Sequence, residues 1–308
     1  MILALSMNPS WDKTASIARF QLDAPNRIQA ERIDVGGKGV NVARVAHELG
    51  EEAELIGFDY ADEPMKTAMA REGIPYRLFP LNGDMRMNLK LRETDTGRTI
   101  EINERGVAVT EEEIKALLHG LLEAAKTGAW YVLTGSLPPG APPDTYHRFC
   151  AAIQAWGCSV ALDCDGEALR EGILAKPALI KPNIQEFCDL TGVSPQDTRV
   201  VLDACRRLCF RGVGRVCLTW GGGGAWLVSA TGAWACSAAK IEARGTQGGG
   251  DTMLAALLIA LSRGMSDPEA LRFASAAAAA TVMRPGTLLC RRCDMEALLP
   301  ELTVGALE

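Results

Sequence analysis

The first 149 of the 308 residues contain no cysteine, and all ten cysteines lie between Cys150 and Cys293. So uneven a distribution in so long a chain is not typical of a secreted disulfide framework. Cys290 and Cys293 have the spacing of a zinc knuckle, but no second pair and no histidine follows them. We therefore expect reduced thiols and a cytoplasmic protein.

The sequence also lacks a long apolar run, a basic leader and an excess of positive charge. The longest apolar candidate, Met253 to Leu261, falls well short of the roughly 20 residues that cross a bilayer, and indicates a core helix. Met1 to Met7 carries no basic residue and no cleavage pattern, which favours a first strand over a signal peptide. A net charge of -6 argues against general nucleic-acid binding. We expect neither a membrane nor nucleic acid as a partner.

A glycine-rich stretch, Gly245 to Thr252, runs directly into the apolar segment. The consecutive glycines Gly248, Gly249 and Gly250 let backbone N–H groups converge at a helix start, where the positive end of the helix dipole favours an anion. Asp251 follows at once and can take a proton from an attacking hydroxyl group. The pattern suggests phosphoryl transfer; the alternative is that Asp251 only caps the helix.

Two further segments suggest contacts with a phosphorylated sugar. In the glycine turn that opens an amphipathic helix, Lys38 can face a phosphate and Asn41 can reach sugar hydroxyls. Asp12 ends the turn after the first strand, at the edge where open α/β sheets bind ligands. The alternative for Asp12 is a turn aspartate bonded to its own backbone.

Strict alternation from Met85 to Leu91 places Arg86, Asn88 and Lys90 on one face of a strand. Two cations and an amide on one face suit a phosphosugar, although a solvated edge strand would alternate in the same way. Residues 99–103 read as its hairpin partner. The alternating segments 17–20 and 32–35 predict further short strands, so a small sheet outside the main core is expected.

Elsewhere strands and helices alternate, which predicts a parallel sheet. After one buried strand, Lys181 and Pro182 precede Asn183, which can cap a helix carrying Glu186 one turn later. This is a capping box, or a magnesium and nucleotide site. The glycine run at 221–224, after Thr219, would let the backbone approach a base or ribose closely.

Together these motifs resemble the ribokinase-like (PfkB) carbohydrate kinases over nearly the whole chain. Asn8 to Asp12, Gly36 to Arg44, Arg86 to Lys90, Gly135 to Gly140 and Leu179 to Asn183 are similar to the branch that acts on phosphorylated hexoses, which includes 1-phosphofructokinases and tagatose-6-phosphate kinases. The resemblance implies one α/β domain over residues 1–308. It would be a ribokinase-like three-layer αβα sandwich with a central, mostly parallel sheet and a small β-sheet lid from about 9–35 and 85–105.

The resemblance also implies a role for each motif. The catalytic group would comprise the base Asp251 and an anion hole formed by the amides of Gly248, Gly249 and Gly250. The substrate-binding residues would be Asp12, Gly37, Lys38, Asn41, Arg86, Asn88 and Lys90. The ATP-binding residues would be Lys181, Asn183, Glu186, Thr219, Gly221 and Gly224, with Asn183 and Glu186 holding Mg²⁺ through water.

We therefore expect a kinase, dependent on ATP and Mg²⁺, that converts fructose 1-phosphate to fructose 1,6-bisphosphate. Tagatose 6-phosphate and fructose 6-phosphate are the near alternatives, and a non-catalytic sugar-phosphate or nucleotide sensor is the alternative of another class. The family's Gly-Ala-Gly-Asp is Gly-Gly-Gly-Asp here, which preserves the amides. Exposed apolar residues on the lid, Met87 and Leu89, would support a homodimer.

Overall fold

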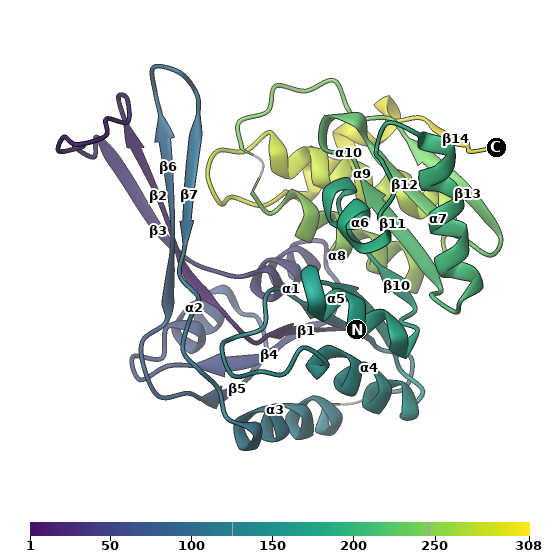
Figure 1. Ribbon diagram of the computed structural model, residues 1–308, viewed down its shortest axis with the longest axis horizontal. Coiled ribbons are helices and arrows are strands. Elements are labelled where there is room, and N and C mark those ends of the chain that lie inside the picture. The colour runs from purple at the N-terminus through teal and green to yellow at the C-terminus, as the bar shows by residue number, and fades with distance from the viewer. Residues whose placement is uncertain (125, 246) are drawn as a thin grey trace.

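The computed structural model describes residues 1–124, 126–245 and 247–308. Thr246, within the glycine-rich stretch, lies outside the described residues. The strands form a ten-stranded sheet in the order β14-β13-β12-β11-β10-β9-β8-β1-β4-β5 and a four-stranded sheet in the order β3-β2-β6-β7. Figure 1 shows the small sheet standing to one side of the main body.

The large sheet is parallel from β5 to β11, and antiparallel from β11 to β14. Its strands are β1 (Ile2–Ser6), β4 (Ala53–Asp59), β5 (Tyr76–Pro80), β8 (Trp130–Thr134), β9 (Ser159–Asp163), β10 (Leu179–Ile180), β11 (Arg215–Thr219), β12 (Ala225–Ser229), β13 (Gly232–Cys236) and β14 (Val304–Ala306). Strands of a parallel sheet read as continuous apolar runs because helices cover both faces, and all five residues of β1 are buried.

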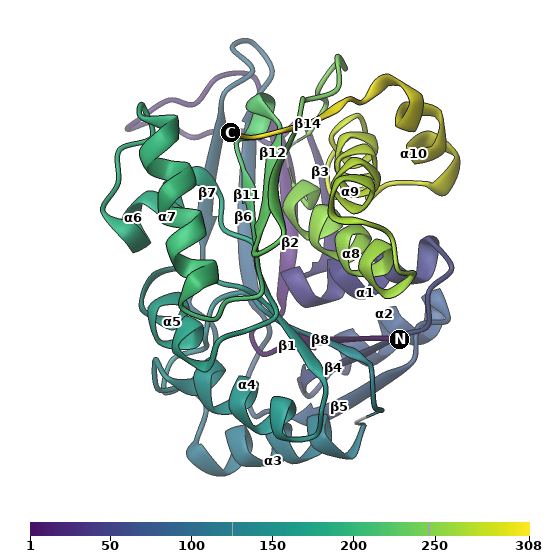
Figure 2. The ribbon, with the colours of Figure 1, turned by 90° about the vertical axis from the view of Figure 1, so that its right-hand side faces the viewer.

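Helices flank this sheet on both sides, as Figure 2 shows with the sheet seen nearly edge-on. One layer contains α3 (Glu111–Glu123), α4 (Thr145–Ala155), α5 (Gly166–Gly172), α6 (Ile184–Thr191) and α7 (Thr198–Phe210). The other contains α1 (Lys38–Glu48), α2 (Pro64–Glu72), α8 (Gly249–Ser262), α9 (Asp267–Val282) and α10 (Arg292–Leu298). The predicted α/β fold with a large, mostly parallel sheet and a smaller sheet is confirmed. Within the described residues, no helix is both long and apolar enough to cross a membrane.

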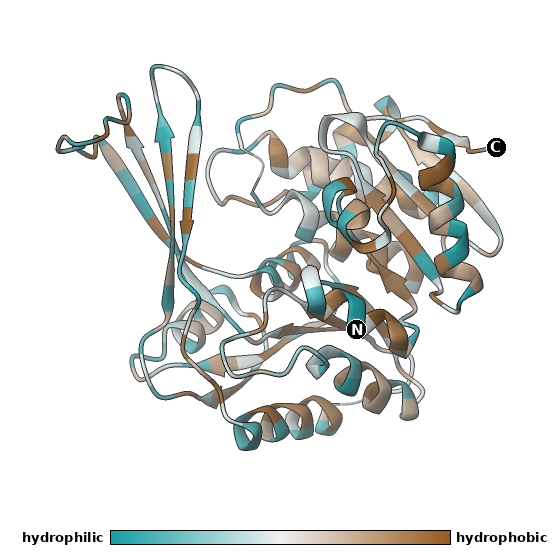
Figure 3. Ribbon diagram, viewed as in Figure 1, coloured by the Kyte–Doolittle hydropathy of each residue, from teal (hydrophilic) through white to brown (hydrophobic). Residues whose placement is uncertain are grey.

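The small sheet is built from β2 (Ser10–Ile17), β3 (Ala30–Gly36), β6 (Arg86–Glu93) and β7 (Thr99–Asn103). Hydrophilic and hydrophobic bands alternate along β6 and β7 in Figure 3, the pattern of a sheet with two different faces. The prediction of a strand at 17–20 is wrong, because β2 ends at Ile17, where its pairing with β6 also ends. Beyond that point Phe20 N donates a hydrogen bond to Glu93 Oε1 at 2.7 Å.

Two expectations about the small sheet need correction. Asp12 lies inside β2, paired with Asp34 and Asn88, rather than in a turn after β1. Met87 and Leu89 are half-buried rather than exposed, because β6 has a neighbouring strand on each side. The exposed apolar residues of that face are Ile33 and Ile102, 47% and 55% exposed on the two outer strands.

Candidate functional site

One cleft of about 1590 Å³ lies between the small sheet and the carboxyl ends of the parallel strands. All of the site residues predicted from the sequence line it. From the small sheet come Asp12, Arg86, Asn88 and Lys90; from the large sheet and its helices come Gly37, Lys38, Asn41, Lys181, Asn183, Glu186, Thr219, Gly221, Gly224, Gly248, Gly249, Gly250 and Asp251. The topology thus brings to one place motifs that are far apart in the chain.

The start of α8 forms the middle of the cleft. Gly248 is its N-cap in a left-handed conformation with φ 74°, which favours glycine, and the backbone N–H groups at a helix start are free to bind an anion. Asp251 is the third residue of α8 and is 8% exposed. Its Oδ2 accepts a hydrogen bond from Asn41 Nδ2 at 2.8 Å. The interpretation of Asp251 as a helix cap is therefore wrong, since its partner is a side chain of α1.

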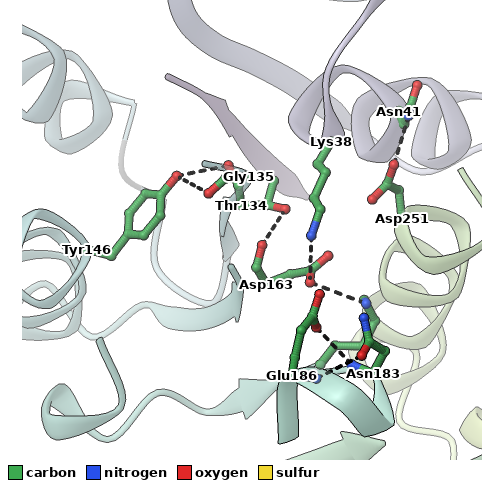
Figure 4. Close-up of polar contacts among 10 residues, drawn as sticks. Lys38, Asn41, Thr134, Gly135, Tyr146, Asp163, Asn183, Glu186 and Asp251 are labelled. Carbon is green, nitrogen blue, oxygen red and sulfur yellow. Dashed lines mark hydrogen bonds and ion pairs between the residues drawn. The ribbon is translucent and has the colours of Figure 1, made fainter. Parts of the chain in front are cut away.

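Opposite Asp251, three charged groups form a cluster that Figure 4 shows in part; two of them, Asp163 and Lys181, are buried, and Lys38 is partly exposed. Asp163, at the end of β9, is 1% exposed, and its Oδ1 lies 3.3 Å from both Lys38 Nζ and Lys181 Nζ. Burial alone would raise the pKa of Asp163, but the two lysines outweigh it and the pKa lies below its usual range. Asp163 thus holds two ammonium groups beside the helix start, where each can face the oxygens of a phosphoryl group.

The surroundings of Asp251 set its proton affinity. Burial raises its pKa most, and the nearby charge of Asp163 raises it further, while Lys38, Asn41 and Lys181 lower it. The balance raises the pKa to about 6. A carboxylate with a pKa near the working pH is ionised at neutral pH yet binds a proton readily, as a general base requires.

The small sheet supplies the polar end of the cleft. Asp12 is buried, and its Oδ1 accepts hydrogen bonds from Ser10 Oγ at 2.8 Å and Asn88 Nδ2 at 3.0 Å. Its Oδ2 accepts from Gln247 Nε2 at 3.2 Å. Burial raises the pKa of Asp12, whereas the Ser10 and Asn88 donors lower it. A carboxylate held this firmly can orient hydroxyl groups of a ligand.

The cations of β6 are partly engaged by the protein itself. Arg86 donates to the Asn8 carbonyl from Nε and Nη2, and to Asn88 Oδ1 and the Glu104 carbonyl from Nη1. Lys90 Nζ lies 3.1 Å from Glu101 Oε1 of β7. Both side chains line the cleft, where their charge attracts an anion.

The two sequence motifs at the far end of the cleft adopt the expected local structures. Asn183 and Glu186 form a capping box at the start of α6, with both side-chain-to-backbone distances 2.9 Å. The loop after β11 is a glycine turn in which Gly221 and Gly224 have positive φ, so backbone rather than side chains faces the cleft. The described residues contain no group of three or more histidine, cysteine or acidic side chains able to hold a metal ion.

Two residues of this site were not assigned from the sequence. These are Asp163, the last residue of β9, and Gln247, in the loop before α8. The end of a buried strand at Asp163 was an available signal, since such ends face ligands in open α/β sheets. Nothing local in the sequence could reveal that Gln247 contacts Asp12, because the two are 235 residues apart.

Comparison with known proteins assigns the chain to a family. The model of the pfkB family carbohydrate kinases matches residues 5–292. The chain belongs to this family. It is therefore a sugar kinase, a phosphotransferase with an alcohol group as acceptor, and ATP is the co-substrate that the family implies. The family and the enzyme class predicted from the sequence are both confirmed.

Individual relatives cover nearly the whole chain. A 1-phosphofructokinase from Rhodobacter capsulatus is 33% identical over 278 residues, which cover 89% of this chain and 88% of that protein. The structure of Escherichia coli phosphofructokinase-2 in complex with fructose-6-phosphate superposes with a TM-score of 0.89 at 27% identity, covering 97% of this chain and 98% of the other. A Thermotoga maritima ribokinase, 20% identical with a TM-score of 0.79, covers 97% of this chain and 99% of its own, and confirms the ribokinase-like fold.

Proposed function

We propose that this kinase transfers a phosphoryl group from ATP to a ketohexose monophosphate, and that fructose 1-phosphate is its substrate. The observation that carries the proposal is the layout of this cleft. A buried carboxylate at the start of α8, Asp251, shares the cleft with the cations Arg86 and Lys90 of the small sheet. The carboxylate can accept the proton of the acceptor hydroxyl, and the two cations can bind a phosphate already present on the sugar. The names of the relatives, phosphofructokinases, support the same substrate class.

In the proposed reaction, Asp251 accepts the proton of the sugar hydroxyl as its oxygen attacks the γ-phosphorus of ATP. The bond between that phosphorus and the bridging oxygen breaks, and its electron pair leaves with ADP. The amides of Gly248, Gly249 and Gly250 would stabilise the transferred group, since preorganised donors act most strongly where charge develops. The ion pair of Lys38 with Asp163 supports a role for this lysine beside the transferred group as well as toward the sugar phosphate.

At the sugar end, we propose that Asp12 and Asn41 orient hydroxyl groups, with Gly37 and Asn88 beside them. Arg86 and Lys90 would face the phosphate of the sugar. Arg86 already makes four hydrogen bonds to the protein, so it would contribute mainly a fixed charge and its remaining N–H.

At the nucleotide end, Lys181, Asn183 and Glu186 would bind the ATP phosphates, and Thr219, Gly221 and Gly224 would contact the nucleoside. Mg²⁺ fits here through water: Asp163 Oδ2 is buried without a hydrogen-bond partner among the described residues, and the capping box engages only one oxygen of Glu186. Mg²⁺ keeps most of its waters and needs few protein ligands. When bound, it would neutralise charge on the phosphates.

Three further points belong to the proposal. Residues 1–308 would form one kinase domain, with the small sheet as a lid contributed by segments 9–35 and 85–105. A homodimer would form through the outer face of the lid, where Ile33 and Ile102 are exposed. All ten cysteines are free thiols, which supports a cytoplasmic enzyme.

Fructose 6-phosphate is the alternative substrate. It is favoured by the structure of phosphofructokinase-2 in complex with fructose-6-phosphate, which superposes closely on this chain. Tagatose 6-phosphate remains a further candidate. The test is ADP release with ATP and Mg²⁺ on fructose 1-phosphate, fructose 6-phosphate, tagatose 6-phosphate, ribose and adenosine. Preference for fructose 1-phosphate supports the proposal, preference for another phosphohexose corrects the substrate, and turnover of ribose or adenosine alone contradicts the assignment of Arg86 and Lys90.

The raised pKa of Asp251 predicts the acidic limb of the pH profile. A base must be ionised, so kcat/KM for the sugar phosphate should be pH-independent above about 7 and fall below a pKa of about 6. The slope should approach tenfold per pH unit, as for one titrating group. Initial rates at saturating ATP from pH 5 to 8 test this. Rates that stay constant down to pH 5, as expected for an aspartate of ordinary pKa, would contradict the effect of burial.

A substitution at Gly36 should affect binding of the sugar phosphate and leave binding of ATP unchanged. A Cβ atom at Gly36 would overlap the carboxylate of Asp12, so Gly36→Ala should displace that carboxylate and raise the KM for the sugar phosphate by roughly tenfold. The KM for ATP should not change. Gly305→Ala is the matched control, because a Cβ there meets no atom within 4 Å. An unchanged sugar KM in Gly36→Ala would argue against Asp12 as a hydroxyl ligand.

A further inference from the structure

Gln247 lies between the two halves of the site and has an unusual environment. Its Nε2 donates to Asp12 Oδ2 at 3.2 Å, which joins the loop before α8 to the small sheet. Its carbonyl oxygen, Oε1, is buried yet has no hydrogen-bond partner among the described residues. The side chain lines the cleft. A buried acceptor left without a donor destabilises the site, and a ligand that donates a hydrogen bond to it would recover that loss.

The Asp12 carboxylate fixes the orientation of the Gln247 amide. Asp12 Oδ1 already accepts hydrogen bonds from Ser10 and Asn88, and Oδ2 is the oxygen that faces the amide. Rotating the amide by half a turn would set its carbonyl oxygen against the carboxylate, with two acceptors in contact. The NH₂ group must therefore point at Asp12, which leaves the carbonyl oxygen for another partner.

The partner of Gln247 Oε1 must suit both this carbonyl oxygen and the nearby carboxylate of Asp12. A phosphate dianion has no hydrogen to donate and would be repelled by Asp12. A hydroxyl group can donate one hydrogen bond and still accept another. Gln247 is followed directly by Gly248, the N-cap of the helix that carries Asp251. A hydroxyl held here is thus positioned by the same short segment that positions the proposed base.

We propose that Gln247 determines sugar specificity, by accepting through Oε1 a hydrogen bond from a ring or chain hydroxyl of the sugar phosphate next to the hydroxyl that Asp12 holds. The inference rests on the proposed function and deepens it. Sugars that lack this hydroxyl leave Oε1 without a hydrogen bond in the complex, and are rejected for that reason. The residue binds and selects the sugar, and takes no part in proton transfer.

The test compares wild-type enzyme with Gln247→Met, using fructose 1-phosphate and its 3-deoxy and 4-deoxy analogues. Wild-type kcat/KM should fall about tenfold or more for one analogue, the value of one buried hydrogen bond. In Gln247→Met, that analogue and the parent sugar should be used about equally, with an unchanged KM for ATP. Gln196→Met, on an exposed loop residue, is the matched control and should keep the wild-type discrimination.

A residue that only braced Asp12 would weaken all three sugars alike and leave the penalty for the deoxy analogue intact. That result, or equal use of the parent sugar and both analogues by the wild-type enzyme, would overturn the inference while the proposed function stands. Wild-type enzyme that phosphorylates no ketohexose phosphate would overturn both.

Discussion

Asp251→Asn should lower kcat by roughly 10²- to 10⁴-fold, the range for loss of a general base, while the binding of sugar phosphate and ATP is retained. Asparagine preserves the shape of the side chain and can still meet Asn41, whose Nδ2 now donates to Asp251 at 2.8 Å. Stopped-flow or steady-state ADP release gives kcat, and calorimetric titration gives the two affinities. Asp203→Asn, on the exposed side of α7, is the control and should retain full activity.

The same substitution should make the protein more stable at alkaline pH. The pKa of Asp251 is about 6 in the folded protein and near 3.8 unfolded, so its charged form opposes folding. This penalty is absent below pH 4, grows as pH rises from 4 to 6 and is constant above. At about 1.4 kcal/mol per pH unit of difference, Asp251→Asn should raise the melting temperature at pH 8 and leave it nearly unchanged at pH 4. Wild-type activity in this variant, or no gain in stability at pH 8, would contradict the role and the environment assigned to Asp251.

Asp163→Asn should have the second largest effect, because it removes the only carboxylate that the two lysines share in the described structure. Lys181 is 4% exposed, and both ammonium groups lie 3.3 Å from Asp163 Oδ1. Removing one partner of a buried ion pair costs about 3–5 kcal/mol. Because Lys38 is partly exposed, we expect a loss of unfolding free energy near the lower end of this range. Chemical denaturation at pH 7.5 would measure the loss.

This variant also predicts a shift in the pH profile. The charge of Asp163 raises the pKa of Asp251, so the acidic limb of kcat/KM should move to lower pH in Asp163→Asn. A double variant with Lys181→Met removes one of the two uncompensated cations and should recover part of the lost stability. If Asp163→Asn is as stable as wild type, or if its acidic limb moves upward, the charge cluster does not act as described.

Local sequence patterns predicted those features of the fold and the site whose physical cause lies within the same short segment. The glycines before Asp251, the alternation of β6 and the capping box at Asn183 are of this kind, since each depends on neighbours within a few residues. Asp12 was placed in a turn because Asn8 and Pro9 signal one. The strand that contains it is fixed by pairing with β3 and β6, which the local pattern does not encode.

Contacts across the cleft could not be predicted in this way. Asn41 and Asp251 are 210 residues apart, and their hydrogen bond exists only because α1 packs beside α8. Lys38 likewise appeared as a phosphate ligand from its glycine turn, whereas its ion pair with Asp163 depends on where β9 ends. The roles proposed for these residues remain predictions that the substitutions above test.

The most direct test of the account is to follow fructose 1-phosphate, ATP and Mg²⁺ with the purified enzyme by phosphorus NMR. We expect one new phosphomonoester signal on the sugar to appear with ADP, while the original C1 phosphate is retained, as in fructose 1,6-bisphosphate. Asp251→Asn at the same concentration should form this product at least roughly a hundredfold more slowly. ADP formed without a new sugar phosphate, or an unchanged spectrum, would contradict the proposal that this kinase phosphorylates fructose 1-phosphate.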